Sequence, residues 1–169
     1  KEAQILYRKL HLFDISLTGQ KPIRESDTFK HGPKPHIFEF GGFKFGSSIC
    51  YDIRFAELYS YYAKNQVDAI LIPSAFLVKT GQAHWEVLLR ARAIESQCYV
   101  VAAGQTGVHR SAQHEETRET FGHSMVIDPW GEILACHVQG PGVAIAEIDL
   151  GRIAKVRANL PALEHRTLR

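Results

Sequence analysis

Apolar and polar residues fall into alternating blocks that predict strands and helices in turn along this chain. Short runs rich in β-branched and aromatic residues are typical of strands, and longer stretches with apolar residues at helical spacing are typical of helices. The predicted strands cover residues 4–9, 36–40, 43–49, 69–72, 98–101, 124–127, 132–136 and 143–149, and the predicted helices cover 55–64, 82–97 and 153–159. This alternation predicts an α/β domain with helices layered on a sheet.

Two polar stretches separate these blocks and are predicted to be loops. Residues 14–35 contain Gly, Pro and mixed charges without a sustained hydrophobic period, and residues 104–120 are polar. Gly41-Gly42 can supply the positive φ angles of a tight hairpin turn between strands 36–40 and 43–49. The sequence shows no internal repeat and no sign of a second domain, so residues 1–169 are interpreted as part of one domain.

Composition and charge exclude several classes of partner. The chain has 169 residues and a formal net charge of +2, from 20 Lys and Arg against 18 Asp and Glu that are spread along the sequence. Without a basic block, nucleic acid is not an expected partner. No apolar run reaches the length of a membrane span, and nothing resembles a signal peptide, so we expect no membrane partner.

Cysteine usage indicates the compartment. Cys50, Cys98 and Cys136 form neither a CxxC pair nor an even framework, which favours free thiols in a reducing compartment. The cytoplasm is therefore the expected location, with mitochondria as a second one if a targeting segment precedes the chain. No Gly-rich phosphate loop or dinucleotide fingerprint occurs, so no nucleotide cofactor is expected.

Cys50 is the first candidate for chemistry. It lies in the run ICYDIRF (residues 49–55), where a strand pattern breaks sharply before a helical one. Such a junction can expose a side chain while nearby backbone N–H groups point at a substrate oxygen. Taken alone, a Cys at the end of an apolar strand is more often a small buried side chain. A nucleophilic role requires activation by a nearby cation or base.

Two other candidates are equally ambiguous when taken singly. Lys9 lies in YRKLHLFD (residues 7–14), and a Lys at a strand end is usually a solvated charge. Glu86 lies in AHWE (residues 83–86), near the start of a predicted helix, where the helix dipole favours an anion for structural reasons alone.

Read together and in order, these segments resemble the nitrilase superfamily of carbon–nitrogen hydrolases. The resemblance rests on YRKLHLFD, ICYDIRF, PSAF (73–76), AHWE and LRARAIE (89–95), and it extends from Tyr7 to about Pro161. The segments QCYVVAA (97–103) and GHSMV (122–126) are most similar to the branch that hydrolyses deaminated glutathione, with omega-amidases as close relatives. Agreement over several segments is more specific than any single motif.

The resemblance implies an amidase whose catalytic set is Glu, Lys and Cys, with a second Glu nearby. It makes Cys50 the nucleophile, Lys9 the catalytic lysine and Glu86 the second glutamate, which orients the lysine. These three side chains are expected to converge in one cleft. The backbone N–H of Tyr51 would stabilise the oxyanion, and the acyl-enzyme would be a thioester that needs neither metal nor cofactor.

The resemblance also suggests residues that bind a small amide substrate. Arg54 would grip a substrate carboxylate, because a planar guanidinium matches a planar anion. An ordinary salt-bridged arginine at a helix start is the alternative for Arg54. Phe76 and Thr80 fall where relatives line the pocket.

One departure concerns the general-base glutamate, which the family carries on a strand well before the lysine. The sequence opens without Met and Ile5-Leu6-Tyr7 has the pattern of a strand already under way. We therefore expect a C-terminal part of an αββα sandwich, incomplete at the N-terminus and inactive alone, that pairs as a homodimer.

Two alternatives to this function stay open. Within the enzyme class, the protein could be an omega-amidase or a carbamoyl-amide hydrolase. In another class, it could be a catalytically incomplete fragment that acts only by association.

Overall fold

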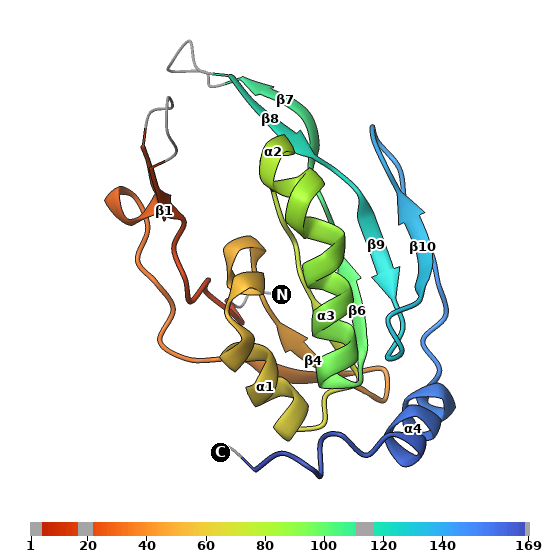
Figure 1. Ribbon diagram of the computed structural model, residues 1–169. Helices are drawn as coiled ribbons and strands as arrows, with labels where there is room; N and C mark the ends of the chain where they lie inside the picture. Colours follow the sequence, from red (N-terminus) through yellow and green to blue (C-terminus); the bar gives the residue numbers. More distant parts are fainter. Residues whose placement is uncertain (1–4, 17–21, 111–116, 168–169) are drawn as a thin grey trace.

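The computed structural model describes residues 5–16, 22–110 and 117–167, and their main feature is a mixed six-stranded sheet (Figure 1). The strands lie in the order β10-β9-β6-β5-β4-β3. Their bounds are β3 Ile37–Phe40, β4 Phe43–Ser47, β5 Ala69–Leu71, β6 Tyr99–Ala102, β9 Ser124–Ile127 and β10 Ile133–His137. The three central strands, β4, β5 and β6, are parallel, and the remaining neighbours pair antiparallel. A mixed sheet with helices confirms the predicted α/β class.

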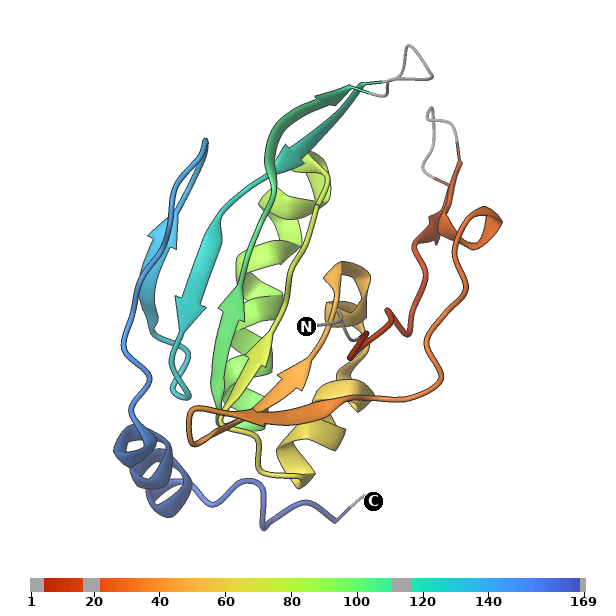
Figure 2. The same cartoon turned by 180° about the vertical axis from the view of Figure 1, so that it is seen from behind.

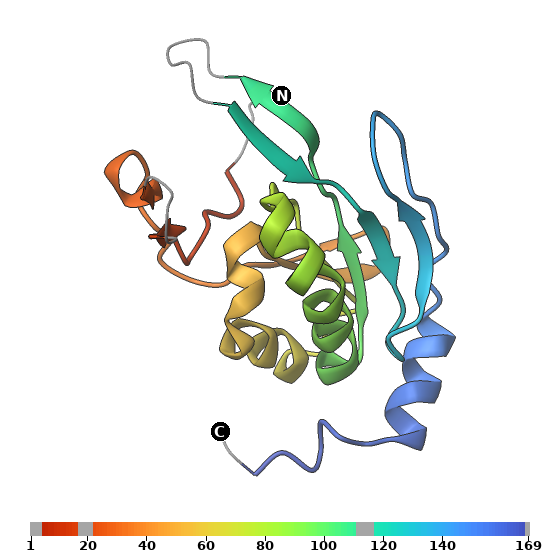
Figure 3. The same cartoon turned by 45° about the horizontal axis from the view of Figure 1, so that its top comes forward.

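Two helices cover one face of this sheet. Helices α1 (Ala56–Lys64) and α3 (Glu86–Ser96) lie side by side on that face, as the view along them shows (Figure 3). The chain enters α3 through the short helix α2 (Val78–Thr80) and one π-helical turn, η3 (Gly81–Trp85). Single π-helical turns inside longer helices are frequent at functional sites.

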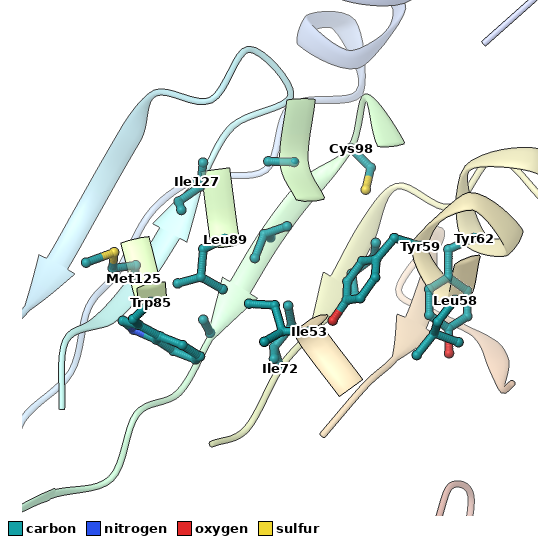
Figure 4. Close-up of a cluster of buried hydrophobic side chains, with 14 of the residues drawn as sticks. Ile53, Leu58, Tyr59, Tyr62, Ile72, Trp85, Leu89, Cys98, Met125 and Ile127 are labelled. Atoms are coloured by element: carbon teal, nitrogen blue, oxygen red, sulfur yellow. The ribbon is translucent and has the colours of Figure 1, made fainter. Parts of the chain in front are cut away.

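The apolar core lies between these helices and the sheet. Alternate residues of the strands face the helices, so that Ile70 and Val100 meet Leu89 of α3, and all three are fully buried. Trp85, Tyr59 and Tyr62 are the largest side chains buried in this cluster (Figure 4). Burying such side chains is the dominant favourable contribution to folding.

The opposite face carries the C-terminal helix α4 (Leu150–Asn159) at one end, and Figure 2 shows the strands from this side. Ile153 of α4 packs against Ala69 and Tyr99, which point away from the main core. The helix begins three residues earlier than predicted, because the Asp149 carboxylate caps it by accepting a hydrogen bond from the Gly151 N–H at 2.7 Å. A carboxylate at this position satisfies one of the free N–H groups of the first helical turn.

Two small antiparallel pairs flank the sheet at the end where the site lies. Strands β1 (Asp14–Ile15) and β2 (Ile23–Arg24) pair ahead of a 3₁₀ turn, η1 (Glu25–Asp27). Strands β7 (Thr106–Arg110) and β8 (Thr117–Phe121) form the second pair. Both lie where loops were predicted, so the loop predictions for 14–35 and 104–120 are wrong over these strands. Within the two stretches, residues 17–21 and 111–116 lie outside the described residues.

Two predicted strands are also wrong. Residues 5–9 are irregular, and position 4 lies outside the described part of the chain. The Lys9 carbonyl accepts a hydrogen bond from Gly32 instead of pairing with a strand. Residues 143–149 are likewise irregular, and Val143 and Ile145 are exposed. The hairpin at Gly41-Gly42 is confirmed, with positive φ at both glycines.

None of the helices formed by residues 5–16, 22–110 and 117–167 has the length and apolarity needed to cross a bilayer.

Candidate active site

Cys50 lies at a sharp turn between the sheet and the first helix. Strand β4 ends at Ser47, and Cys50 opens the 3₁₀ turn η2 (Cys50–Arg54). Its φ is 49°, in the left-handed region. A non-glycine residue adopts that region only where the surrounding structure enforces it. Here the Cys50 N–H donates to the Pro73 carbonyl at 2.9 Å, which fixes the turn beside the end of β5. The turn places the thiol, half-buried, in the wall of a pocket.

The buried carboxylate of Asp52 holds this turn and the N-terminal segment together. Asp52 is fully buried and accepts hydrogen bonds from the Ile49 N–H at 3.0 Å and the His11 N–H at 2.9 Å. Its oxygens also contact the Tyr7 hydroxyl and the His11 ring nitrogen Nδ1, each at 2.8 Å. A buried charge requires such partners, and here one comes from Ile49, next to Cys50, and three come from the N-terminal residues Tyr7 and His11.

Tyr7 and His11 are fixed further by their surroundings. Burial, and then the Asp52 charge and hydrogen bond, raise the pKa of Tyr7 well above its ordinary value, so the phenol remains a donor. The His11 ring stacks on Phe55 with centroids 3.6 Å apart. The irregular segment before β1 is therefore attached to the turn that carries Cys50.

Lys9 lies close to this turn and forms an ion pair with Glu25. Its ammonium contacts the Glu25 carboxylate and lies 5.9 Å from the centroid of the Tyr51 ring. Tyr51 directly follows Cys50 in the sequence. Glu25 also accepts a hydrogen bond from the Phe13 N–H at 2.8 Å, which ties η1 to the segment after Lys9. Only 12% of the Lys9 side chain is exposed, so Lys9 is not the solvated strand-end charge that its sequence position alone would favour.

The pocket beside the thiol contains all of the predicted binding residues. Its lining residues are Phe13, Cys50, Tyr51, Arg54, Ala75, Phe76, Leu77, Thr80 and Arg118. The structure thus brings together Cys50 and all four predicted binding residues. Lys9 and Glu25 line a second hollow, and the Lys9 ammonium lies 5.9 Å from the centroid of the Tyr51 ring in the first.

Arg54 is held by aromatic rings and not by a carboxylate. Its guanidinium lies 5.8 Å from the ring centroid of Tyr51 and 5.3 Å from that of Phe76. It also contacts the ring nitrogen Nδ1 of His84 at 3.2 Å. No acidic side chain among the described residues pairs with Arg54, so the alternative of a salt-bridged structural arginine does not fit this placement.

Glu86 lies apart from this arrangement, and its expected convergence with Lys9 and Cys50 is not what the structure shows. Its side chain is 52% exposed, and its carboxylate is 3.6 Å from Arg90, one helical turn later. Glu86 is not among the residues that line the pocket, and the described acid that meets Lys9 is Glu25.

The profile of the carbon–nitrogen hydrolase family matches residues 1–158. The chain belongs to this family. It is 50% identical to the deaminated glutathione amidase of Mus musculus over 162 residues, which are 95% of this chain and 48% of that protein. The chain therefore spans about half the length of this curated relative.

Two solved structures show the same carbon–nitrogen hydrolase fold. The NitFhit protein of Caenorhabditis elegans superposes with a TM-score of 0.84 at 44% identity, over 95% of this chain and 38% of the other. Nit3 of Saccharomyces cerevisiae, a member of branch 10 of the nitrilase superfamily, superposes with a TM-score of 0.79 at 35% identity, over 96% of this chain and 54% of the other. These matches confirm the predicted membership of the nitrilase superfamily.

Sequence reasoning missed three residues at this site. Glu25 and Arg118 lie in stretches predicted as loops, where no periodic pattern separates a buried charge from a solvated one. Asp52 lies inside the quoted ICYDIRF motif, and its proximity to Cys50 was the one available signal. Within the described residues, no group of His, Cys, Asp or Glu has an arrangement that could hold a metal ion.

Proposed function

We propose that this chain carries the nucleophile, the lysine and the substrate pocket of an amidase that hydrolyses a small carboxylate-bearing amide such as deaminated glutathione. The observation that carries the proposal is the pocket itself, in which a strained cysteine turn meets Arg54 and apolar side chains. The 50% identity to a deaminated glutathione amidase over 95% of the chain supports the same substrate class.

In the proposed cycle, the Cys50 sulfur attacks the amide carbonyl carbon and forms a tetrahedral intermediate. Lys9 and the backbone N–H of Tyr51 stabilise its oxyanion. The C–N bond then breaks, and the amine leaves with a proton, so that a thioester remains on Cys50. A water molecule cleaves the thioester to give the carboxylate and restores the thiol. A general base must activate this water by accepting one of its protons.

We assign to Glu25 the role that the sequence suggested for Glu86. Glu25 contacts the Lys9 ammonium and is itself fixed by the Phe13 N–H, so it can hold the lysine in one orientation. Glu86 is solvent-exposed and paired with Arg90, and makes no contact of this kind with Lys9. Arg54 binds a substrate carboxylate, while Tyr51, Phe76 and Thr80 shape the pocket around the acyl chain.

The proposal includes a homodimer located in the cytoplasm, with mitochondria as a second compartment. Val87 and Ile94 of α3 and Trp130 of the turn before β10 are large apolar side chains that lie exposed. Exposed apolar side chains of this kind are consistent with a surface that a second copy covers. Light scattering of the full-length protein should give the mass of two chains, and fractionation of cells should place it.

The decisive experiment replaces the nucleophile in the full-length protein. Cys50→Ala should abolish release of products from deaminated glutathione, whereas Cys136→Ala, which removes an exposed thiol elsewhere, should leave the rate unchanged. Rapid quenching followed by mass spectrometry should detect the acyl group on Cys50 in the wild-type protein. Retained hydrolysis by Cys50→Ala would rule out the proposed nucleophile.

A further inference from the structure

Two guanidinium groups enter the pocket from different parts of the chain. Arg54 comes from the η2 turn, one turn after Cys50, and Arg118 comes from β8. We propose that Arg118 binds a second substrate carboxylate, so that the preferred substrate is a linear amide with one carboxylate on each side of the bond that breaks. This inference rests on the proposed function, because it assigns the two halves of the substrate to two cations around Cys50.

The position of Arg118 is fixed by the pocket wall. Strand β8 meets that wall through a bridge between Leu77 and Thr120, and the Phe121 N–H donates to the Phe76 carbonyl at 2.9 Å. Phe121 also packs where a Cβ atom on Gly81 would lie, only 2.3 Å away, so only glycine permits this approach. Arg118 therefore projects from a strand that is anchored to the same segment that supplies Phe76.

The Arg118 guanidinium has a hydrogen-bond donor without a partner among the described residues. Its Nη2 donates to the Ala75 carbonyl at 2.9 Å, while its Nε is buried and has no hydrogen-bond partner. No acidic side chain in the described part of the chain pairs with Arg118. A guanidinium carries five N–H donors, and a buried donor without an acceptor is unfavourable. A carboxylate, which accepts two parallel N–H bonds from a guanidinium, is the partner that best matches the shape and charge of Arg118.

The two arginines differ in what already surrounds them, which is why we assign them different carboxylates. Arg54 lies between the Tyr51 and Phe76 rings, close to the nucleophile, and suits the carboxylate of the acyl half. Arg118 is tied to Ala75 on the wall formed with β8, and suits the carboxylate of the amine half. None of the described residues that line the pocket is Asp or Glu. The described lining thus carries two positive charges and no acid, which favours a dianion.

This assignment separates two substrate classes that the sequence left open. Deaminated glutathione has a 2-oxo acid carboxylate in its acyl half and a glycine carboxylate in its amine half. An omega-amide of a 2-oxo acid, which releases ammonia, has only the first of these. A site that uses Arg118 should therefore prefer the two-carboxylate amide, because a polar group built to meet an anion is left unpaired by a substrate that lacks it.

The test compares two substrates in the full-length enzyme, namely deaminated glutathione and its analogue with the glycine carboxylate converted to a carboxamide. Arg118→Gln should lower kcat/KM for deaminated glutathione by roughly tenfold to a hundredfold, mostly through KM, and lower that for the carboxamide by less than about threefold. Arg118→Lys keeps the charge and loses the planar guanidinium fork. Its kcat/KM for deaminated glutathione should lie between those of wild type and Arg118→Gln.

A matched control is available on the same hairpin. Arg110→Gln changes an exposed arginine on β7 that does not line the pocket, and it should leave both rates unchanged. Thermal melting of each variant shows whether the fold is retained. If a folded Arg118→Gln variant lost kcat/KM equally for both substrates, Arg118 would be a structural support for Ala75 and the inference would be overturned. An unchanged kcat/KM for both substrates would overturn it as well.

Failure of the inference and failure of the proposed function give different results. If wild-type protein hydrolyses neither substrate, or if Cys50→Ala retains activity, the proposed function itself is wrong. If wild-type protein is active, Cys50→Ala is inactive and Arg118→Gln does not discriminate between the substrates, the function stands and only the assignment of the second carboxylate fails.

Discussion

The helix-covered core and the Cys50 turn are held in place by different kinds of interaction. In the core, fully buried apolar residues such as Ile70, Leu89 and Val100 pack against one another, so each position is supported by many weak contacts. Around the turn, the irregular N-terminal segment is attached through two carboxylates, Asp52 and Glu25, that collect directed hydrogen bonds and one ion pair. Substitutions in the first region should therefore change stability, and those in the second should change activity.

The largest expected difference between the two regions is in their thiols. Cys98 belongs to the core, where burial raises its pKa from 9.0 to about 12. At pH 8 such a thiol is about one part in ten thousand thiolate, and only the thiolate reacts with iodoacetamide. The Cys50 thiol is half-buried at the pocket, beside the turn that Lys9 approaches, and should be alkylated far faster.

Mass mapping after brief labelling of the full-length protein checks this order. Cys136 should lie between the other two, because burial and the nearby Glu86 charge raise its pKa while its surface remains exposed. In denaturant, all three thiols should react alike. Faster labelling of Cys98 than of Cys50 in the native protein would contradict the assignment.

Because the pKa of Cys98 is raised in the folded state, protonation of this thiol favours folding below about pH 9, and that advantage is lost as the pH rises toward 12.

A core substitution should lower stability while the site remains competent. Leu89 is a fully buried side chain of α3 that packs against the sheet. Leu89→Ala should reduce the free energy of unfolding by about 2–5 kcal/mol, through lost burial and the cavity left behind. Lys64 is an exposed residue of helix α1 that lies outside the pocket and outside the proposed dimer surface. Lys64→Ala should therefore change the free energy of unfolding by less than about 0.5 kcal/mol.

Urea unfolding monitored by circular dichroism measures both variants. At a temperature where Leu89→Ala is still folded, its kcat/KM should be close to that of wild type. A large loss of activity without a loss of stability would mean that the core and the Cys50 turn are not as separable as their contacts indicate.

Sequence patterns predicted the first region well and the second poorly, for a physical reason. The helix 55–64 and the strand 69–72 follow from local periodicity, because their apolar positions must face one core. The β7–β8 hairpin was missed because its strands are largely exposed and carry polar residues, so no burial pattern reveals them. The strand expected at 143–149 is irregular, although its residues have strand propensity, because its apolar side chains find no partner strand in the described part of the chain.

The same limit applies to the candidate site. The family resemblance was enough to bring Cys50 and Arg54 together, since both lie in one short motif. The acid that meets Lys9 could not be chosen in this way, because the contact with Glu25 joins residues 16 positions apart through an irregular segment. Glu86 has the expected chemistry, but its helix turns it toward Arg90. Only the three-dimensional path of the chain distinguishes the two acids.

A substitution of Arg54 tests whether the polar region around the Cys50 turn binds the substrate carboxylate. Arg54→Lys keeps the charge but loses the planar fork, so kcat/KM for a carboxylate-bearing amide should fall by roughly tenfold to a hundredfold, equivalent to about 1.4–3 kcal/mol. A neutral amide without that carboxylate should be affected much less. Steady-state kinetics on the two amides measure this difference, and equal losses would instead indicate an arginine that supports the turn beside Tyr51 and Phe76.

The smallest expected effect comes from one donor of the Asp52 cluster. Tyr7→Phe removes the hydroxyl that lies 2.8 Å from the buried carboxylate and leaves its other three contacts in place. Because the remaining donors still solvate the charge, the free energy of unfolding should fall by only about 1 kcal/mol. The pKa of Tyr7 is raised above its ordinary 10.0, so this contribution is fully present below pH 10 and is lost only as the pH rises further.

Activity is the more informative readout for Tyr7→Phe. Tyr7 is two residues from Lys9, and its bond to Asp52 is one of the contacts that fix the Lys9 segment beside the Cys50 turn. A loss of about 1 kcal/mol in stability leaves the protein folded, so by itself it should not change kcat. If polar contacts position this region, Tyr7→Phe should nevertheless lower kcat. Tyr61→Phe, which removes a hydroxyl from an exposed tyrosine of α1, is the matched control and should change neither quantity. An unchanged kcat in Tyr7→Phe would show that Glu25 and the remaining Asp52 contacts suffice to hold Lys9 in place.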